Sequence, residues 1–184
     1  MLNILIPTLG RSTLDRTLTS LHGQLEVTDQ ALVVADGVTV DPALIRRHRA
    51  ALPLQVVNHP HRLGHWGHAI RNAYQPLLTG HTLHMDDDDV YLPGAIATVK
   101  RRIVECPDRL LMFRVRLRDG REIPETETFT LGHVSTLCGC VPCDPERLGV
   151  WTLRNGGDCD FYSETAERMG VAWFPDVIAE VKGI

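Results

Sequence analysis

The first half of the sequence alternates short apolar runs with segments of helical periodicity, and this alternation limits the possible folds more than any other feature. The apolar runs, each ended by polar or turn-forming residues, predict strands at residues 3–7, 31–35, 54–58 and 82–85. The amphipathic segments between them predict helices at residues 13–21, 42–51 and 67–78. Such alternation predicts an α/β fold with a mainly parallel central sheet and helices on both faces.

The second half is less regular, and its predicted elements are a strand at 109–117, a helix at 158–169 and a strand at 171–174. At 184 residues the chain is long enough for one well-buried domain and short for two. No repeat, linker or low-complexity segment divides it. We therefore predict a single domain that spans residues 1–184.

The composition is that of a soluble globular protein, because 43% of the residues are hydrophobic and 23% are charged. No apolar run approaches the roughly 18 residues of a membrane span, and no basic segment with a cleavage site opens the chain. A cytoplasmic location is therefore expected. The net charge of −4 provides no general attraction for nucleic acid.

Four consecutive aspartates, Asp86 to Asp89, follow the apolar run at 82–85. Adjacent carboxylates repel, and each disfavours ionisation of its neighbours. An isolated acidic run is more often a solvated turn, but carboxylates gathered at a strand end are most simply stabilised by a hard cation. Carboxylate oxygens suit Mg²⁺ or Mn²⁺, and Mg²⁺ sites commonly combine one or two carboxylates with substrate phosphates.

A further aspartate, Asp36, ends the strand predicted at 31–35, about fifty residues before the acidic run. In parallel sheets, ligands gather beyond the carboxyl ends of the strands. Asp36 and the four aspartates all occupy that end of the predicted sheet, and their convergence predicts a nucleotide or phosphate site. The alternative for Asp36 is a turn-forming role before Gly37.

Five segments in succession resemble the family-2 inverting glycosyltransferases of GT-A fold, over nearly the whole chain. They are residues 4–11, residues 18–24, Val33-Val-Ala-Asp-Gly37, residues 62–64 with 69–72, and Met85-Asp-Asp-Asp-Asp-Val-Tyr-Leu-Pro93. The third segment departs from the Asp-Asp-Gly-Ser that is usual in the family, because Ala35 replaces the first acid.

The resemblance implies a nucleotide-diphosphate sugar donor. It places Thr8, Gly10 and Arg11 beside the donor, and it gives Asp36 a contact with the donor nucleobase. Because a carboxylate accepts a hydrogen bond from an imide N–H, a UDP- or TDP-type donor is favoured. Arg71 is expected to bind phosphate oxygens through two N–H groups.

Within the acidic run, Asp86 and Asp88 form the Asp-x-Asp pair of the family. The resemblance implies that Asp88 and Asp86 hold Mg²⁺ or Mn²⁺ at the donor diphosphate, with Asp88 the stronger candidate, and that Asp87 faces the ribose. Which aspartates contact the ion directly stays open, as does the role of Asp89.

The second half of the domain, about residues 94–184, is expected to supply the acceptor site and the base, and about residues 1–93 to bind the donor. Asn155-Gly-Gly-Asp-Cys-Asp-Phe161 resembles the Gly-Glu-Asp segment at the start of a late helix of the family, with Gly157 where glutamate is common. Asp158 is the candidate base that deprotonates the acceptor hydroxyl, and Asp160 is the second candidate. An aspartate at Asp158 would equally suit a helix N-cap.

Structural interpretations are preferred for three other groups of residues. Reduced thiols are preferred over a zinc site at Cys138, Cys140 and Cys143. Solvated or base-stacking rings are preferred over metal ligands at His59, His61, His65 and His68. Packing is preferred for Trp66, Trp151 and Trp173, of which Trp151 has the best chance of lying near the acceptor.

The sequence thus predicts a metal-dependent inverting glycosyltransferase that moves a sugar from a nucleotide-diphosphate donor to a hydroxyl acceptor of unknown kind. One alternative is a non-catalytic or degenerate nucleotide-sugar-binding module, because the glutamate expected at Gly157 is absent. A less favoured alternative is a sugar-phosphate nucleotidyltransferase. Such enzymes resemble one another in an early lysine-containing loop, whereas the first lysine of this chain is Lys100.

Overall fold

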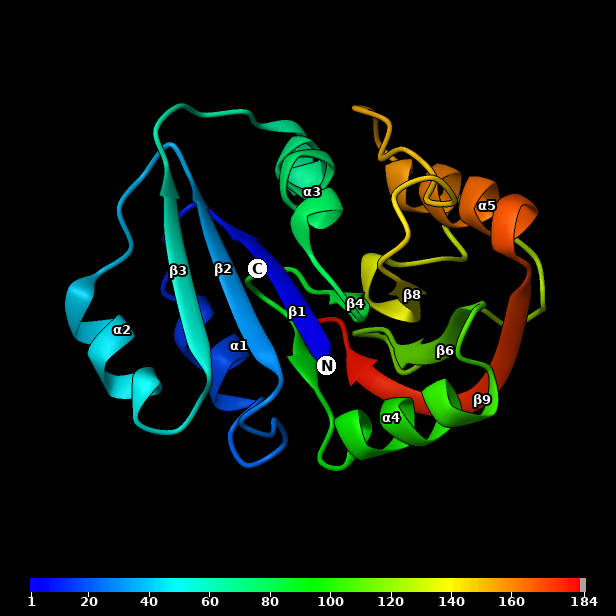
Figure 1. Cartoon of the computed structure of the whole chain (residues 1–184), viewed down its shortest axis with the longest axis horizontal. Helices are drawn as coiled ribbons and strands as arrows, with labels where there is room; N and C mark the ends of the chain where they lie inside the picture. The colour runs from blue at the N-terminus through cyan, green and yellow to red at the C-terminus, as the bar shows by residue number, and fades with distance from the viewer. Residues whose placement is uncertain (183–184) are drawn as a thin grey trace.

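The structure of the protein is a computed structural model that describes residues 1–182. A nine-stranded sheet has the order β3-β2-β1-β4-β8-β6-β9-β5, and β7 pairs with β6 (Figure 1). The strands are β1 Leu2–Thr8, β2 Gln30–Asp36, β3 Leu54–His59, β4 His81–His84, β5 Val90–Tyr91, β6 Leu110–Arg116, β7 Glu122–Ile123, β8 Gly139–Pro142 and β9 Val171–Glu180. The helices are α1 Leu14–Thr19, α2 Pro42–Arg49, α3 His68–Tyr74, α4 Ala95–Glu105 and α5 Gly157–Met169, with short 3-10 turns at His65–Gly67, Gln75–Leu77 and Thr136–Cys138.

The first half of the sheet is parallel, as the sequence predicts. β1 pairs with β2 on one side and with β4 on the other, and β2 pairs with β3. The arrowheads of β2 and β3 point to the same end of the sheet in Figure 1. Asp36 is the last residue of β2, and the acidic run begins two residues after β4. Both features therefore lie at the carboxyl ends of parallel strands.

Alternating side chains along β1 separate two cores. Ile4 and Ile6 belong to a large cluster that contains Leu14 of α1, whereas Leu5 packs in a small cluster with Ile70 of α3. Helices α1 and α3 therefore cover opposite faces of the sheet, which confirms the predicted layers. Each fully buried side chain of this kind contributes roughly 1.5–3 kcal/mol to the free energy of unfolding.

The second half of the chain completes the sheet with mixed pairing. β8 lies antiparallel between β4 and β6, while β9 runs parallel to β6 and antiparallel to β5. Because β5 directly follows the acidic run but pairs with the last strand, the two halves of the chain share one sheet. The functional division at about residue 93 stays a prediction. Helix α4 packs on β9, and α5 packs on β6.

Three details differ from the sequence prediction. Helix α4 was not predicted, although Ile96, Val99 and Ile103 have helical spacing and pack toward the core. Strand β9 continues beyond the predicted end at residue 174 as far as Glu180, because β5 and β6 both offer it pairing partners. The helix predicted at 13–21 is shorter in the structure, because α1 spans Leu14–Thr19, and the side chain of its N-cap residue Thr13 makes no capping hydrogen bond.

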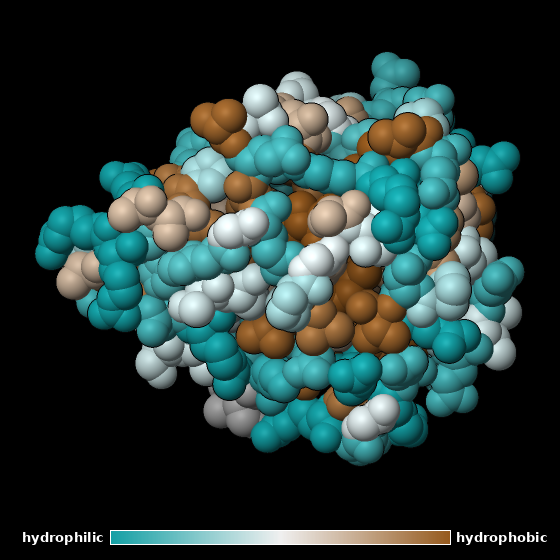
Figure 2. Space-filling model, turned by 90° about the horizontal axis from the view of Figure 1, so that it is seen from below, coloured by the Kyte–Doolittle hydropathy of each residue, from teal (hydrophilic) through white to brown (hydrophobic). Residues whose placement is uncertain are grey.

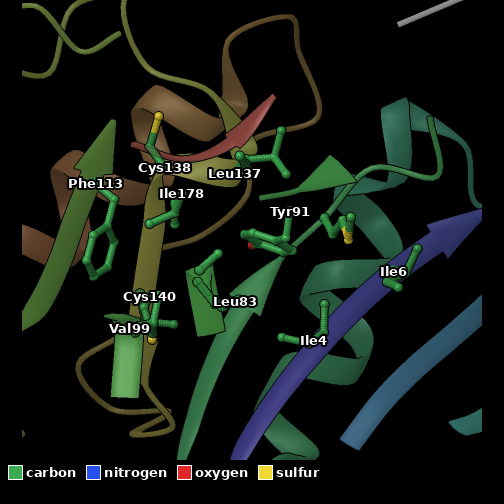
Figure 3. Close-up of a cluster of buried hydrophobic side chains, with 14 of the residues drawn as sticks. Ile4, Ile6, Leu83, Tyr91, Val99, Phe113, Leu137, Cys138, Cys140 and Ile178 are labelled. Carbon is green, nitrogen blue, oxygen red and sulfur yellow. The ribbon is translucent and has the colours of Figure 1, made fainter. Parts of the chain in front are cut away.

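The core between the sheet and α4 contains two of the cysteines. Figure 3 shows Cys138 and Cys140 among labelled apolar residues such as Leu137 and Ile178. Burial raises the pKa of the Cys138 thiol to about 12 and also raises that of Cys140. The five cysteines are free. Within residues 1–182 no three His, Cys, Asp or Glu side chains form a group that could hold a metal ion, and the preference for reduced thiols stays a prediction.

The face opposite the carboxyl ends of β2 and β3 is seen in Figure 2, where hydrophobic side chains gather near the centre and hydrophilic ones surround them. Among the described residues, no helix combines the length and the apolar character that crossing a membrane requires.

Candidate functional site

A cavity of about 540 Å³ opens at the carboxyl ends of β1, β2 and β4. Its walls come from the end of β1 and the loop after it, from the end of β2, from the loop between β3 and α3, and from the acidic run. The predicted site residues that line it are Thr8, Arg11, Asp36, Asp86, Asp87 and Asp88. The fold thus brings Asp36 and the acidic run to one cavity, as the strand-end argument requires. Gly10 is outside the lining and donates its N–H to Thr8 Oγ1 at 2.9 Å.

Asp87 is buried and held from the β1 side. Thr8 Oγ1 donates to Asp87 Oδ2 at 2.5 Å, and the Leu9 amide donates to the same oxygen at 3.4 Å. Arg11 Nη1 lies 3.5 Å from Asp87 Oδ1. These contacts join the loop after β1 to the segment after β4, so that one wall of the cavity has a defined geometry.

Asp88 sits between like charges. Burial raises its pKa, and the neighbouring Asp86 and Asp87 carboxylates raise it further, while Arg11 at 3.3 Å opposes the shift. The backbone here is fixed by α1, because Arg16 Nη2 donates to Asp88 O at 2.6 Å and Thr17 Oγ1 donates to Asp89 O at 2.8 Å. A carboxylate that is costly to ionise in this position would be stabilised by a bound cation.

Asp36 also accepts two backbone hydrogen bonds that the sequence did not predict. It is 4% exposed, and its two oxygens accept the amides of Leu63 at 2.6 Å and of Gly64 at 2.8 Å. Gly37 permits this approach, because a Cβ there would lie 2.6 Å from Arg62 N. Asp36 therefore anchors the loop between β3 and α3. Each carboxylate oxygen has two lone pairs, so acceptor capacity remains on the cavity side.

Arg71 is buried behind Asp86, which the sequence did not reveal. Its side chain is 0% exposed and outside the cavity lining, so it does not present its guanidinium to phosphate oxygens in this structure. Arg71 Nη2 donates to Asp86 Oδ1 at 2.5 Å, and Nη1 donates to Trp66 O at 3.1 Å. The guanidinium also lies 4.9 Å from the centroid of the Trp151 ring. In this structure the buried guanidinium supports Asp86 and the loop at Trp66, and phosphate binding by Arg71 stays a prediction.

Trp66 is a cavity residue that the sequence interpretation missed. It was expected to pack, but it is 68% exposed and lines the cavity. Trp151 was expected to have the best chance of a functional contact, but it is 1% exposed. Its ring stacks on the Phe161 ring, with the two ring centroids 4.4 Å apart. The signal for Trp66 was its place between Gly64 and Gly67, two glycines that permit a tight loop.

The start of α5 holds the two candidate bases. Asp158 lies outside the cavity lining; burial raises its pKa, and the nearby charge of Asp86 raises it further. Asp160 is different: although burial opposes the change, hydrogen bonds from Thr152 and Arg154 lower its pKa. A carboxyl with a raised pKa is the better proton acceptor, so the directions of the two pKa shifts favour Asp158 over Asp160.

The absence of glutamate at position 157 has a steric reason. A Cβ on Gly157 would lie 2.3 Å from Thr152 O and 2.6 Å from His68 Nδ1. His68 is buried, its Nδ1 lies 2.8 Å from Thr152 O, and burial lowers its pKa. Because a carbonyl only accepts, Nδ1 carries the proton of the neutral ring. The imidazole of His68 therefore occupies the space that a longer side chain at 157 would need.

The other histidines of this loop do not converge as ligands. His59 Nδ1 lies 3.0 Å from the Tyr74 hydroxyl, and His65 Nδ1 lies 3.2 Å from Leu153 O. These two rings therefore have separate hydrogen-bond partners, and the non-metal interpretation stays a prediction.

Comparison with known proteins identifies the fold. No protein-family model and no curated protein matches the sequence. A solved structure of S. aureus TarS, residues 1–349, is similar, with a TM-score of 0.79 and 16% identity over 98% of this chain and 60% of that one. TarS 1–349 in complex with UDP-GlcNAc has a TM-score of 0.74 and 16% identity over 100% and 58% of the two chains.

TarS 1–349 in complex with UDP gives a TM-score of 0.73 and 14% identity, with 98% of this chain and 60% of that chain covered. The chain thus spans about 60% of the length of the TarS 1–349 structures that it matches. At this level of identity the likeness concerns the fold. The protein has the GT-A glycosyltransferase fold that the sequence resemblance predicted.

Proposed function

We propose that this chain is the donor-binding and catalytic domain of a metal-dependent inverting glycosyltransferase with a UDP-sugar donor. The observation that carries the proposal is the cavity in which Asp36 and three aspartates of the acidic run meet at the carboxyl ends of β1, β2 and β4. The same fold was solved in TarS with UDP-GlcNAc and with UDP. Parallel sheets bind nucleotides at this edge.

Uridine is proposed to lie on the side of Asp36. The carboxylate is fixed by the Leu63 and Gly64 amides, and a remaining lone pair would accept the imide N–H of uracil. Asp87, which Thr8 holds in place, is proposed to face the ribose. A pre-oriented acceptor loses little freedom on binding, which favours affinity.

Mg²⁺ or Mn²⁺ is proposed to bind at Asp88, with Asp86 as a second contact. Carboxylate oxygens suit both ions, and the raised pKa of Asp88 reflects the burial and repulsion that a cation would relieve. Since no group of three candidate ligands exists within residues 1–182, the remaining ligands would come from the donor diphosphate and water. When bound, the ion would neutralise charge on the diphosphate leaving group.

Asp158 is proposed to accept the proton of the acceptor hydroxyl. The freed oxygen attacks the anomeric carbon on the face opposite the diphosphate, the carbon–oxygen bond to the diphosphate breaks, and the electron pair leaves with the phosphate oxygen. The raised pKa of Asp158 makes its carboxylate a stronger base than an ordinary aspartate. Attack from the opposite face inverts the anomeric configuration.

The first test is binding of UDP and UDP-GlcNAc by calorimetry, with and without Mn²⁺, followed by hydrolysis of UDP-GlcNAc. Asp88→Asn keeps the size of the side chain but removes the charge. We expect at least about a 100-fold loss of Mn²⁺-dependent hydrolysis in this variant. Asp119→Asn, at an exposed turn, is the matched control. Undiminished hydrolysis by Asp88→Asn would refute the metal assignment.

The same experiments separate the rival functions. Tight, Mn²⁺-dependent binding without hydrolysis or transfer to any added hydroxyl would identify a binding module. Formation of UDP-GlcNAc and pyrophosphate from UTP and N-acetylglucosamine 1-phosphate would identify a nucleotidyltransferase. Either result would replace the proposed transferase activity.

A further inference from the structure

Trp66 combines two features that packing does not explain. Its side chain is 68% exposed, whereas Trp151 is 1% exposed in the core. It also lines the cavity that contains the acidic run. A large aromatic side chain held open to solvent at the wall of a polar cavity offers a flat apolar surface to a ligand.

The backbone at Trp66 is in a conformation that a bulky residue rarely adopts. His65 has φ +56° and Trp66 has φ +53°, between Gly64 at φ +73° and Gly67 at φ +81°. A non-glycine residue in the left-handed region is strained, and such strain tends to persist at functional sites where the surroundings enforce it.

The surroundings enforce the conformation from several sides. Asp36 holds the Gly64 amide, Arg71 Nη1 donates to Trp66 O, and the Gly67 amide donates to Gly64 O at 3.3 Å. A Cβ on Gly67 would lie 2.7 Å from Pro7 Cβ, so the loop is pressed against the end of β1. All of these contacts involve the backbone near Trp66. They fix the backbone from which the indole side chain projects and leave that side chain exposed.

The Trp66 ring approaches a residue that is bound to the segment just before α5. The Trp66 ring is 6.1 Å from the His68 ring, and His68 is bonded to Thr152 O just before α5. A Cβ on Gly157, the residue before Asp158, would lie 2.6 Å from His68 Nδ1, so His68 contacts the start of α5. Trp66 therefore lines the cavity of the acidic run and lies next to His68, which contacts the start of α5, where the candidate base Asp158 is located.

We propose that Trp66 is a saccharide platform, a surface on which the apolar face of a sugar ring packs. This inference rests on the proposed function. In a transfer reaction, the part of the substrates that must lie between the diphosphate and the base is the transferred sugar, with the acceptor beside it. The proposed function places the nucleobase beside Asp36, so this inference assigns the indole to the sugar and not to the base.

Calorimetry with UDP and UDP-GlcNAc, both with Mn²⁺, tests the platform. The variant Trp66→Ala should lower the affinity for UDP-GlcNAc about tenfold and change that for UDP less than about twofold. This result would assign the platform to the donor sugar. An equal loss for UDP and UDP-GlcNAc would overturn the inference, because Trp66 would then contact the nucleotide.

A fluorescence titration tests whether the platform binds an acceptor sugar. Methyl β-N-acetylglucosaminide, added to the UDP-bound protein, should quench indole emission in the wild type and in Trp173→Phe but not in Trp66→Phe. Quenching of this kind with unchanged UDP-GlcNAc affinity in Trp66→Ala would assign the platform to the acceptor. Unchanged affinities together with no Trp66-dependent quenching would overturn the inference. A wild-type protein that binds neither nucleotide would refute the proposed donor instead, and glycoside quenching of the nucleotide-free protein would then decide the role of Trp66.

Trp66→Gly separates binding from a structural role. Glycine adopts positive φ without steric cost, so this variant should keep or raise the melting temperature while losing the saccharide response. A lowered melting temperature with intact saccharide affinity would show that Trp66 supports the fold, and would overturn the inference.

Discussion

The carboxylates on the two sides of the candidate site are held in different ways. On the β1–β2–β4 side, Asp87 accepts from Thr8 Oγ1, and both oxygens of Asp36 accept backbone amides. On the α5 side, the hydrogen bond that Asp158 accepts within the described residues comes from the adjacent Cys159 amide, at 2.8 Å. Burial raises the pKa of Asp158.

The difference separates two kinds of chemistry. Carboxylates with fixed partners suit binding, because their geometry is set before the ligand arrives. A buried carboxyl with a raised pKa suits proton transfer, because it stabilises a proton more strongly. The two regions are expected to respond differently to mutation: the first through affinity, the second through turnover.

Removing the base should have the largest effect. Asp158→Asn should lower kcat by about 10²–10⁴-fold and leave UDP-GlcNAc affinity within about twofold. Because the pKa of Asp158 is raised, the lower-pH limb of the wild-type kcat profile should lie above the usual aspartate range. Steady-state kinetics across pH measure both the fall of kcat in the variant and the position of the lower-pH limb in the wild type. Asp160→Asn is the control; an equal fall in its kcat would break the distinction between the two aspartates.

Weakening the hydrogen bonds between Asp36 and the loop after β3 should lower the affinity for UDP. Asp36→Asn replaces one acceptor oxygen by a donor, so that either the Leu63 or the Gly64 amide loses its partner. We expect the affinity for UDP, measured by calorimetry, to fall about tenfold. Asp41→Asn, at the N-cap of α2, should leave this affinity unchanged. Wild-type affinity in Asp36→Asn would contradict the role of the loop.

A side chain at position 157 should lower the free energy of unfolding. Gly157→Ala places a Cβ against Thr152 O and the His68 ring, and should lower the free energy of unfolding by about 1–3 kcal/mol in urea titrations. Adding His68→Ala should recover part of the loss. Strictly additive effects of the two substitutions would show that the His68 ring is not the obstacle.

The smallest expected effect concerns the pH dependence of stability. Burial lowers the pKa of His84 well below its usual value. As the pH falls, His84 therefore binds a proton in the unfolded chain at pH values at which it stays neutral in the folded protein. Stability should therefore decline as pH falls below about 6.5, by at most about 1.4 kcal/mol per pH unit from this group. Urea titrations at several pH values measure the slope. His84→Gln should flatten it, whereas the exposed His133→Gln should not; equal slopes in both variants would exclude His84.

Much of the first half followed from the sequence. The apolar runs that became β1 to β4 are visible as periodicity, and the rule for parallel sheets placed Asp36 near Asp86, Asp87 and Asp88. The second half was harder. Strand β8 has four residues and β5 two, and such short segments carry little pattern of their own. Their pairing depends on neighbours that are distant in sequence.

The sequence by itself determined the order of strands and helices in the first half of the chain and the edge of the sheet at which the carboxylates collect. Periodicity and strand-end chemistry are local properties, so they can be read from neighbouring residues. Only the tertiary structure decided that Arg71 is buried behind Asp86 and that Trp66 faces the cavity. These outcomes depend on contacts between distant segments, such as Thr8 with Asp87, which no local pattern records.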